Sequence, residues 1–134
     1  MRVFENKHLS IDYISERSYF KVVRLSSEPL DDSRYKQLML NWREQIEFYK
    51  PKLQLVNYLN FYRPIPPYMQ TWINDNLVKP AFENGMLKVA FIISRDLYVQ
   101  VSLEQTMHED AGKKLSVKYF DNELDADNWL NENL

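Results

Sequence analysis

The apolar run from Leu87 to Ile93 constrains the fold of this chain more than any other feature of the sequence. Residues 89–93 read VAFII without a polar interruption, which is typical of a strand covered on both faces of a helix-flanked sheet. Upstream, Trp72 belongs to an apolar face with helical spacing, and Gly85 stands where a helix would end in left-handed backbone. The sequence therefore predicts a helix, a glycine stop and an interior strand with parallel neighbours.

Two short strands joined by a polar link are predicted near the N-terminus. Leu9, Ile11 and Tyr13 alternate with polar residues, which is the pattern of a half-buried strand. Residues 20–25 include aromatic and β-branched side chains that favour a second strand. Because only the short polar stretch 15–17 separates them, we expect an antiparallel hairpin.

The clearest amphipathic helix follows the hairpin. Asp31, Asp32 and Ser33 are all suitable N-caps, and the two acids suit the positive end of the helix dipole. Apolar and aromatic residues then recur every three or four positions as far as Tyr49, and Pro51 ends the helix. We expect this aromatic stripe to pack against the sheet.

A third strand is predicted over residues 53–61, followed by a proline-rich loop at 60–68. Asn57 interrupts the apolar face of this strand, and we expect it to lie near the strand end with solvent or backbone partners. The next helix is expected to run to about Phe82. Pro80 lies inside that helix and should bend or break it.

One further helix, strand and helix are expected after the buried strand. Ser102 opens a capping-box pattern, which places a helix over residues 103–112. Residues 115–119 alternate as a last strand, and Asp121 or Asn122 caps a final helix.

The element order β-β-α-β-α-β-α-β-α predicts an α/β fold in a single domain over residues 1–134. We expect a mixed, mostly parallel sheet of four to five strands, with the N-terminal hairpin at one side and about four helices. The 45% hydrophobic content of this chain is enough to form a core without disulfide bonds.

Composition and charge exclude several classes of function. The chain has no cysteine and only two histidines, so we expect no cofactor, no metal and no enzymatic activity. Its net charge of −2, with both signs mixed, does not favour nucleic acid. No apolar run is long enough to span a membrane, and the N-terminus has no apolar signal core, so we expect a cytoplasmic protein.

The acidic C-terminal stretch superficially fits the ligand spacing of a calcium-binding loop. The acids with this spacing are Asp121, Glu123, Asp125, Asp127 and Glu132, but Ala126 stands where the sharp turn of such a loop needs glycine. We interpret these acids as the start of a helix, where the dipole favours negative charge.

Several core and turn residues resemble those of a known superfamily. The matching positions are Trp72, Pro80, Gly85, Val89, Ala90, Phe91, Tyr119, Phe120, Asp121, Ala126, Trp129 and Leu130. In this pattern the chain resembles the SpoIIAA-like, or STAS-like, superfamily of small bacterial α/β domains. The resemblance covers the C-terminal half well and the N-terminal half only in element order. It implies a mixed sheet of four or five strands covered by four helices.

The resemblance leaves two classes of function open. Members that antagonise anti-sigma factors carry a phosphorylatable Ser or Thr after the third strand, whereas residues 60–68 of this chain contain neither. We therefore expect a non-enzymatic regulatory or protein-interaction module without the phosphorylation switch, whose partner is another protein or a second copy of the chain. The alternative, implied by the related SEC14-like branch, is a domain that binds a small apolar ligand or lipid.

We predict that the partner or ligand meets the loop at residues 60–68, near residues 95–98. Both segments follow strands, and sites in parallel sheets form beyond the carboxyl ends of the strands. Aromatic residues and arginine anchor interfaces, and the prolines of the loop lower the ordering cost of binding. The candidate binding residues are Asn60, Phe61, Tyr62, Arg63, Tyr68, Arg95 and Tyr98. The alternative is that the aromatic loop is a lid that only closes the core.

Overall fold

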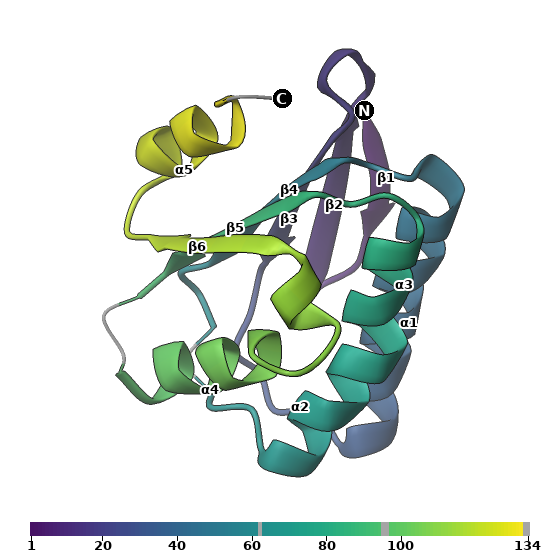
Figure 1. Ribbon diagram of the computed structural model, residues 1–134. Helices are drawn as coiled ribbons and strands as arrows, with labels where there is room; N and C mark the ends of the chain where they lie inside the picture. Colours follow the sequence, from purple (N-terminus) through teal and green to yellow (C-terminus); the bar gives the residue numbers. More distant parts are fainter. Residues whose placement is uncertain (62, 95–96, 133–134) are drawn as a thin grey trace.

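A computed structural model describes residues 1–61, 63–94 and 97–132, and within them the chain forms one six-stranded mixed sheet (Figure 1). The strands lie in the sheet in the same order as in the sequence. They are β1 (Arg2–Glu5), β2 (Leu9–Ile14), β3 (Tyr19–Arg24), β4 (Leu53–Tyr58), β5 (Lys88–Ile93) and β6 (Ser116–Phe120).

The strand pairing confirms an α/β fold with a mixed, mostly parallel sheet. β2 pairs antiparallel with β1 and with β3, so the predicted hairpin is present. From β3 to β6 every neighbouring pair is parallel. β5 lies between β4 and β6, which confirms that the apolar run is an interior strand with parallel neighbours.

The first strand, β1, is one strand more than the sequence predicted. Its residues are only half-buried or exposed, so it has no continuous apolar pattern to reveal it. The edge position is held instead by contacts across the sheet. The Tyr13 N–H donates to the Met1 carbonyl at 2.8 Å, and the Arg2 guanidinium donates to both carboxylate oxygens of Asp12.

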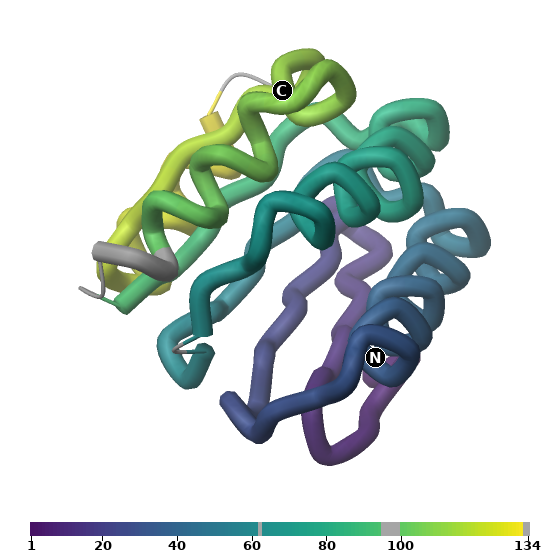
Figure 2. Tube along the Cα trace, turned by 90° about the horizontal axis from the view of Figure 1, so that it is seen from below, coloured from purple at the N-terminus to yellow at the C-terminus, as the bar shows by residue number. Residues whose placement is uncertain are grey.

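The helices form a layer on one face of the sheet, and a single helix lies on the other (Figure 1). They are α1 (Asp32–Tyr49), α2 (Pro67–Ile73), η2 (Asn74–Val78), α3 (Lys79–Glu83), α4 (Leu97–Met107) and α5 (Glu123–Leu130), with short 3₁₀ turns η1 (Ser15–Arg17) and η3 (Gly112–Lys114). Figure 2 shows α1, the continuous α2–η2–α3 segment and α4 side by side in chain order. None of the described helices combines the length and apolarity that crossing a membrane requires.

Each face of the sheet has its own apolar core. The larger core lies under the helical layer and includes Phe20, Trp42 and Phe91. On the opposite face α5 packs against β4, β5 and β6, and its Ala126 and Leu130 are fully buried there. Because helices cover both faces of the sheet, the side chains of β5 are apolar on both faces.

Local capping signals were confirmed at three helix ends. Asp31 is the N-cap of α1, and its carboxylate accepts a hydrogen bond from the Arg34 N–H at 2.8 Å. Asn122, rather than Asp121, caps α5. Gly85 follows α3 with a φ of +99°, a backbone conformation that favours glycine.

The expected boundaries of α4 were wrong. The helix begins at Leu97 instead of Leu103, so Ser102 lies inside it and is not its N-cap. It ends at Met107, and Gly112 instead belongs to the 3₁₀ turn that follows. Gly112 is required there because a Cβ would approach the Met107 carbonyl oxygen to 2.2 Å. The capping-box pattern is local, whereas Ser102 and Leu103 are buried where α4 packs against α2, so packing outweighs the local pattern.

β4 ends earlier than the sequence predicted, at Tyr58 instead of Phe61. The side chain of Asn57 accepts a hydrogen bond from the Leu59 N–H at 3.0 Å, which replaces a partner in the sheet. The expectation that Asn57 marks the strand end with a backbone partner is therefore confirmed.

Pro80 does not break its helix. The chain passes from α2 to α3 through one wider, π-helical turn, η2, which ends two residues before the proline. Because proline has no N–H, a carbonyl in the preceding turn loses its helical donor. The Arg43 guanidinium of α1 donates to the Asn76 carbonyl at 3.4 Å and supplies a replacement.

Candidate functional site

A pocket of about 220 Å³ lies beyond the carboxyl ends of β3 and β4, and we call it the Arg24 pocket. Because β3 and β4 are parallel neighbours, the segments that follow Arg24 and Tyr58 leave the sheet at the same end. The described residues that line the pocket are Arg24, Glu28, Pro29, Leu30, Asp32, Tyr35, Phe61, Arg63, Pro64, Ile65, Pro66, Tyr68 and Met69. The pocket therefore includes the predicted aromatic loop as one of its walls.

Arg24 is the most deeply buried charged side chain of this site. Side chains alternate along β3, so Arg24 shares the helix-facing side of the strand with Phe20 and Val22. Only 1% of its surface is exposed. Burying a charged group is costly unless it is paired, so its partners decide what it does.

Aromatic rings surround the Arg24 guanidinium. Its central carbon lies 4.5 Å from the ring centroid of Phe61, 5.7 Å from that of Tyr35 and 5.9 Å from that of Tyr58. Such contacts place the cation over the negative faces of the rings. Among the described residues Arg24 Nε and Nη1 have no hydrogen-bond partner. The guanidinium also lies close enough to the hydroxyls of Tyr35 and Tyr58 to lower the pKa of each, which opposes the effect of burial.

The hydroxyl of Tyr35 is a second buried polar group without a hydrogen-bond partner among the described residues. Burial raises its pKa above the ordinary tyrosine value, and the nearby Arg24 charge opposes that rise. Burial raises the pKa of Tyr58 in the same way, again opposed by Arg24. Both hydroxyls are therefore neutral donors beside the buried cation at physiological pH.

The acidic residues of the pocket have other partners. Glu28 forms an ion pair with Lys7 at 3.1 Å. Asp32 accepts a hydrogen bond from the Tyr68 hydroxyl at 3.0 Å. Neither carboxylate forms an ion pair with Arg24 in the structure.

The predicted aromatic loop is tied to the segment that follows β3. Arg63 Nε donates to the Ser27 carbonyl at 2.8 Å, and the Ser27 hydroxyl donates to the Asn60 carbonyl. Phe61 is only 3% exposed and belongs to the core, whereas Tyr68 is 59% exposed. Phe61 thus closes the core, as the lid interpretation predicts, whereas Asn60, Arg63 and Tyr68 lie at the surface, so binding by this loop stays a prediction.

Three of the candidate binding residues cannot be assigned to the pocket. Tyr62 and Arg95 lie outside the described residues, as does the side chain of Tyr98 at the start of α4. No described residue after β5 lines the pocket, so the expected proximity of residues 60–68 and 95–98 stays a prediction.

Sequence reasoning missed Arg24 and Tyr35. A signal for Arg24 was present, because it occupies the apolar face of a strand together with Phe20 and Val22. Tyr35 had no comparable signal, since its place in the aromatic stripe of α1 is equally suited to core packing.

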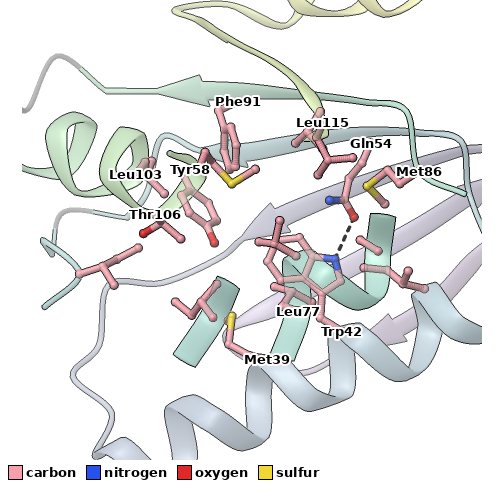
Figure 3. A pocket seen from close by; sticks show the side chains of 17 residues that line it. Met39, Trp42, Gln54, Tyr58, Leu77, Met86, Phe91, Leu103, Thr106 and Leu115 are labelled. Carbon is pink, nitrogen blue, oxygen red and sulfur yellow. Dashed lines mark hydrogen bonds between the residues drawn. The ribbon is translucent and has the colours of Figure 1, made fainter. Parts of the chain in front are cut away.

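A second cavity lies inside the main core, between the helical layer and the sheet (Figure 3). It is lined largely by apolar side chains, including Met39, Leu77 and Phe91, and its volume is about 40 Å³. Ligand pockets usually measure roughly 300–1,000 Å³, so this cavity is a packing gap rather than a ligand site. The Arg24 pocket, at about 220 Å³, lies below that range but is several times larger than the core cavity.

The described lining of the Arg24 pocket contains no His, Lys, Ser or Thr. Its two carboxylates already have partners, because Glu28 pairs with Lys7 and Asp32 accepts a hydrogen bond from the Tyr68 hydroxyl. His8 precedes β2 and His108 follows α4, and neither lines this pocket. Within residues 1–61, 63–94 and 97–132 there is no group of three or more His, Asp or Glu side chains arranged to hold a metal ion.

Comparison of the chain with protein-family models, with curated proteins and with solved structures finds no match. The resemblance to the SpoIIAA-like superfamily therefore stays a prediction.

Proposed function

We propose that this chain is a non-enzymatic regulatory module that binds a small ligand in the Arg24 pocket. The observation that carries this proposal is a concave site with mostly apolar walls and a few converging polar groups. That combination is the usual character of small-molecule sites. The site also lies beyond the carboxyl ends of parallel strands, where open α/β sheets bind their ligands.

The walls of the pocket are held in place without a ligand. Arg63 and Tyr68 join the loop to the segment after β3 and to the start of α1 through their hydrogen bonds to Ser27 and Asp32. Pro64, Pro66 and Pro67 restrict the backbone between them. A site whose walls are already ordered loses little conformational entropy on binding.

The groups in the pocket favour binding over catalysis. Buried Arg24 can hold an anion and the Tyr35 hydroxyl can donate a hydrogen bond, but neither is paired with a general base. A binding module needs recognition of its ligand and no catalytic group.

A protein partner is the second candidate, and one observation favours it. Leu25 and Leu59 are large exposed side chains that directly follow β3 and β4, and exposed Tyr68 lies in the first turn of α2. Tyrosine is among the residue types that anchor interfaces. In this reading the pocket would receive a side chain of the partner.

Native mass spectrometry of the purified protein tests the proposal. We expect a retained small molecule, or binding of fragment compounds that shifts the NMR signals of Leu30 and Ile65 in the pocket wall. Leu30→Trp should fill the pocket and abolish both signals. Leu25→Trp is the matched control, because Leu25 is exposed and lies outside the pocket lining.

Two results would contradict ligand binding. Leu30→Trp protein that binds the same compounds as the wild type would show that they bind elsewhere. Subunit association that is lost in Tyr68→Ala but kept in Leu30→Trp would favour the protein-partner function instead.

A further inference from the structure

We propose that the ligand of the Arg24 pocket is a small monocarboxylate, whose carboxylate pairs with Arg24 while its apolar body contacts the pocket wall. This inference rests on the proposed function and names the chemical class of the ligand. It starts from the burial of Arg24, which is 1% exposed and has no carboxylate partner among the described residues.

A comparison with Arg17, at the other end of β3, shows how unusual the surroundings of Arg24 are. Arg17 lies just before the same strand, at its other end, and also stacks on a tyrosine, with its guanidinium carbon 4.1 Å from the Tyr19 ring centroid. Its guanidinium is satisfied by the Asp127 carboxylate at 2.8 Å and by the Asn131 side chain at 2.6 Å. Arg24 has the aromatic contacts but lacks the acid, so a bound anion would complete the same arrangement.

The charges around the pocket favour one negative charge. Glu28 pairs with Lys7, Asp32 accepts from Tyr68 and Arg63 donates to the Ser27 carbonyl, whereas Arg24 Nε and Nη1 have no partner among the described residues. The site therefore offers one unpaired cation, and the two acids would repel a second negative charge on the ligand. A monoanion therefore fits better than a dicarboxylate or a phosphate dianion.

The shape of the groups favours a carboxylate. A guanidinium is a planar fork of donors that matches the two oxygens of a carboxylate. The Tyr35 hydroxyl beside it offers one more donor. The remaining wall is formed by Leu30, Phe61 and Ile65, which suits a short aliphatic or aromatic body.

Calorimetric titration with sodium benzoate and with benzamide tests this class of ligand. The two probes have nearly the same shape, but only benzoate carries the negative charge. We expect benzoate to bind the wild-type protein at least about tenfold more tightly than benzamide, because ionised hydrogen bonds are stronger than neutral ones. Inorganic phosphate should bind more weakly than benzoate.

Arg24→Met should weaken benzoate binding at least about tenfold while leaving benzamide binding nearly unchanged. Arg17→Met is the matched control, because it removes a stacked arginine at the opposite end of β3 and should leave benzoate binding unchanged. Circular dichroism verifies that both variants fold. Arg24→Met also removes the contacts of the guanidinium with three aromatic rings, so its melting temperature changes under either role. Only a ligand-binding role predicts that benzoate binding is weakened while benzamide binding is kept.

A measurement on the wild-type protein makes the test independent of folding of the variants. The Arg24 Nε–H NMR signal should shift on addition of benzoate and stay in place with benzamide. Benzoate binding that is equal in Arg24→Met and wild type, or an unmoved Arg24 signal at saturating benzoate, would overturn the inference.

The outcomes separate this inference from the proposed function. Equal affinities of benzamide and benzoate for the pocket would support small-molecule binding but contradict a carboxylate as the ligand. Tighter binding of phosphate than of benzoate would do the same. If neither benzoate nor any fragment compound bound and no ligand were retained, both proposals would fail.

Discussion

The Trp42 indole N–H donates a hydrogen bond to the Gln54 side-chain oxygen at 2.9 Å, inside the main core (Figure 3). Trp42 belongs to α1 and Gln54 to β4, so this bond joins the helical layer to the centre of the sheet. Both side chains are buried, and each satisfies a polar group of the other that water cannot reach.

Gln54→Leu should destabilise the protein by about 1–3 kcal/mol, because it leaves the buried Trp42 N–H without an acceptor. Urea denaturation measures the change. Adding Trp42→Phe removes the indole N–H that Gln54→Leu leaves without an acceptor. The double variant should therefore lose less stability than the sum of the two single variants. Strictly additive losses would show that the bond contributes nothing beyond packing.

Gly85→Val should cost more than about 1 kcal/mol, because Gly85 has a φ of +99° that a β-branched residue adopts only with strain. A Cβ at this position would meet no atom within 4 Å, so the cost comes from the backbone and not from crowding. Gly85→Asn is the control and should cost less, since asparagine tolerates positive φ better. An unchanged denaturation midpoint for the valine variant would contradict the role of this residue as a helix stop.

Arg43→Met should destabilise the protein by about 0.5–1.5 kcal/mol through loss of the hydrogen bond to the Asn76 carbonyl. In a Pro80→Ala background the same substitution should cost less, because alanine restores a backbone donor to this helix. Arg43 also pairs with Glu47 at 3.1 Å, so Glu47→Gln measures that contribution separately. Equal costs of Arg43→Met in both backgrounds would refute the link to the proline.

The pairing of Arg2 with Asp12 should make the attachment of β1 depend on pH. The hydrogen bond from Arg2 lowers the pKa of Asp12 below its ordinary value in the folded state. The pair therefore stabilises the fold above the unfolded pKa of about 3.9, and this contribution is lost as the pH falls through the lower folded pKa.

Asp12→Asn removes this contribution, so stability should fall less steeply below about pH 4 than in the wild type. Thermal unfolding at a series of pH values measures the difference. Asp75→Asn, which changes an exposed carboxylate in η2 far along the chain, is the control and should keep the wild-type slope. If the stability of Asp12→Asn and of the wild type depended on pH in the same way, β1 would be held by its backbone hydrogen bonds alone.

The sequence alone determined those elements whose signals are local and regular. The apolar run at residues 87–93 predicted an interior strand, and the alternation at Leu9, Ile11 and Tyr13 predicted one partner of a hairpin. Asp31 and Gly85 were identified as helix ends, since capping depends on backbone groups within a few residues. For the site, the sequence predicted the loop at residues 60–68.

Tertiary structure decided what depends on contacts between distant segments. β1 forms because β2 supplies its hydrogen bonds, and around Pro80 the Arg43 guanidinium of another helix donates to the Asn76 carbonyl. α4 continues through the capping pattern at Ser102, whose side chain is buried against the core instead of standing at a helix end. The Arg24 pocket arises for the same reason. Its buried cation, its rings and its loop come from separate segments, which only the parallel pairing of β3 and β4 brings to one end of the sheet.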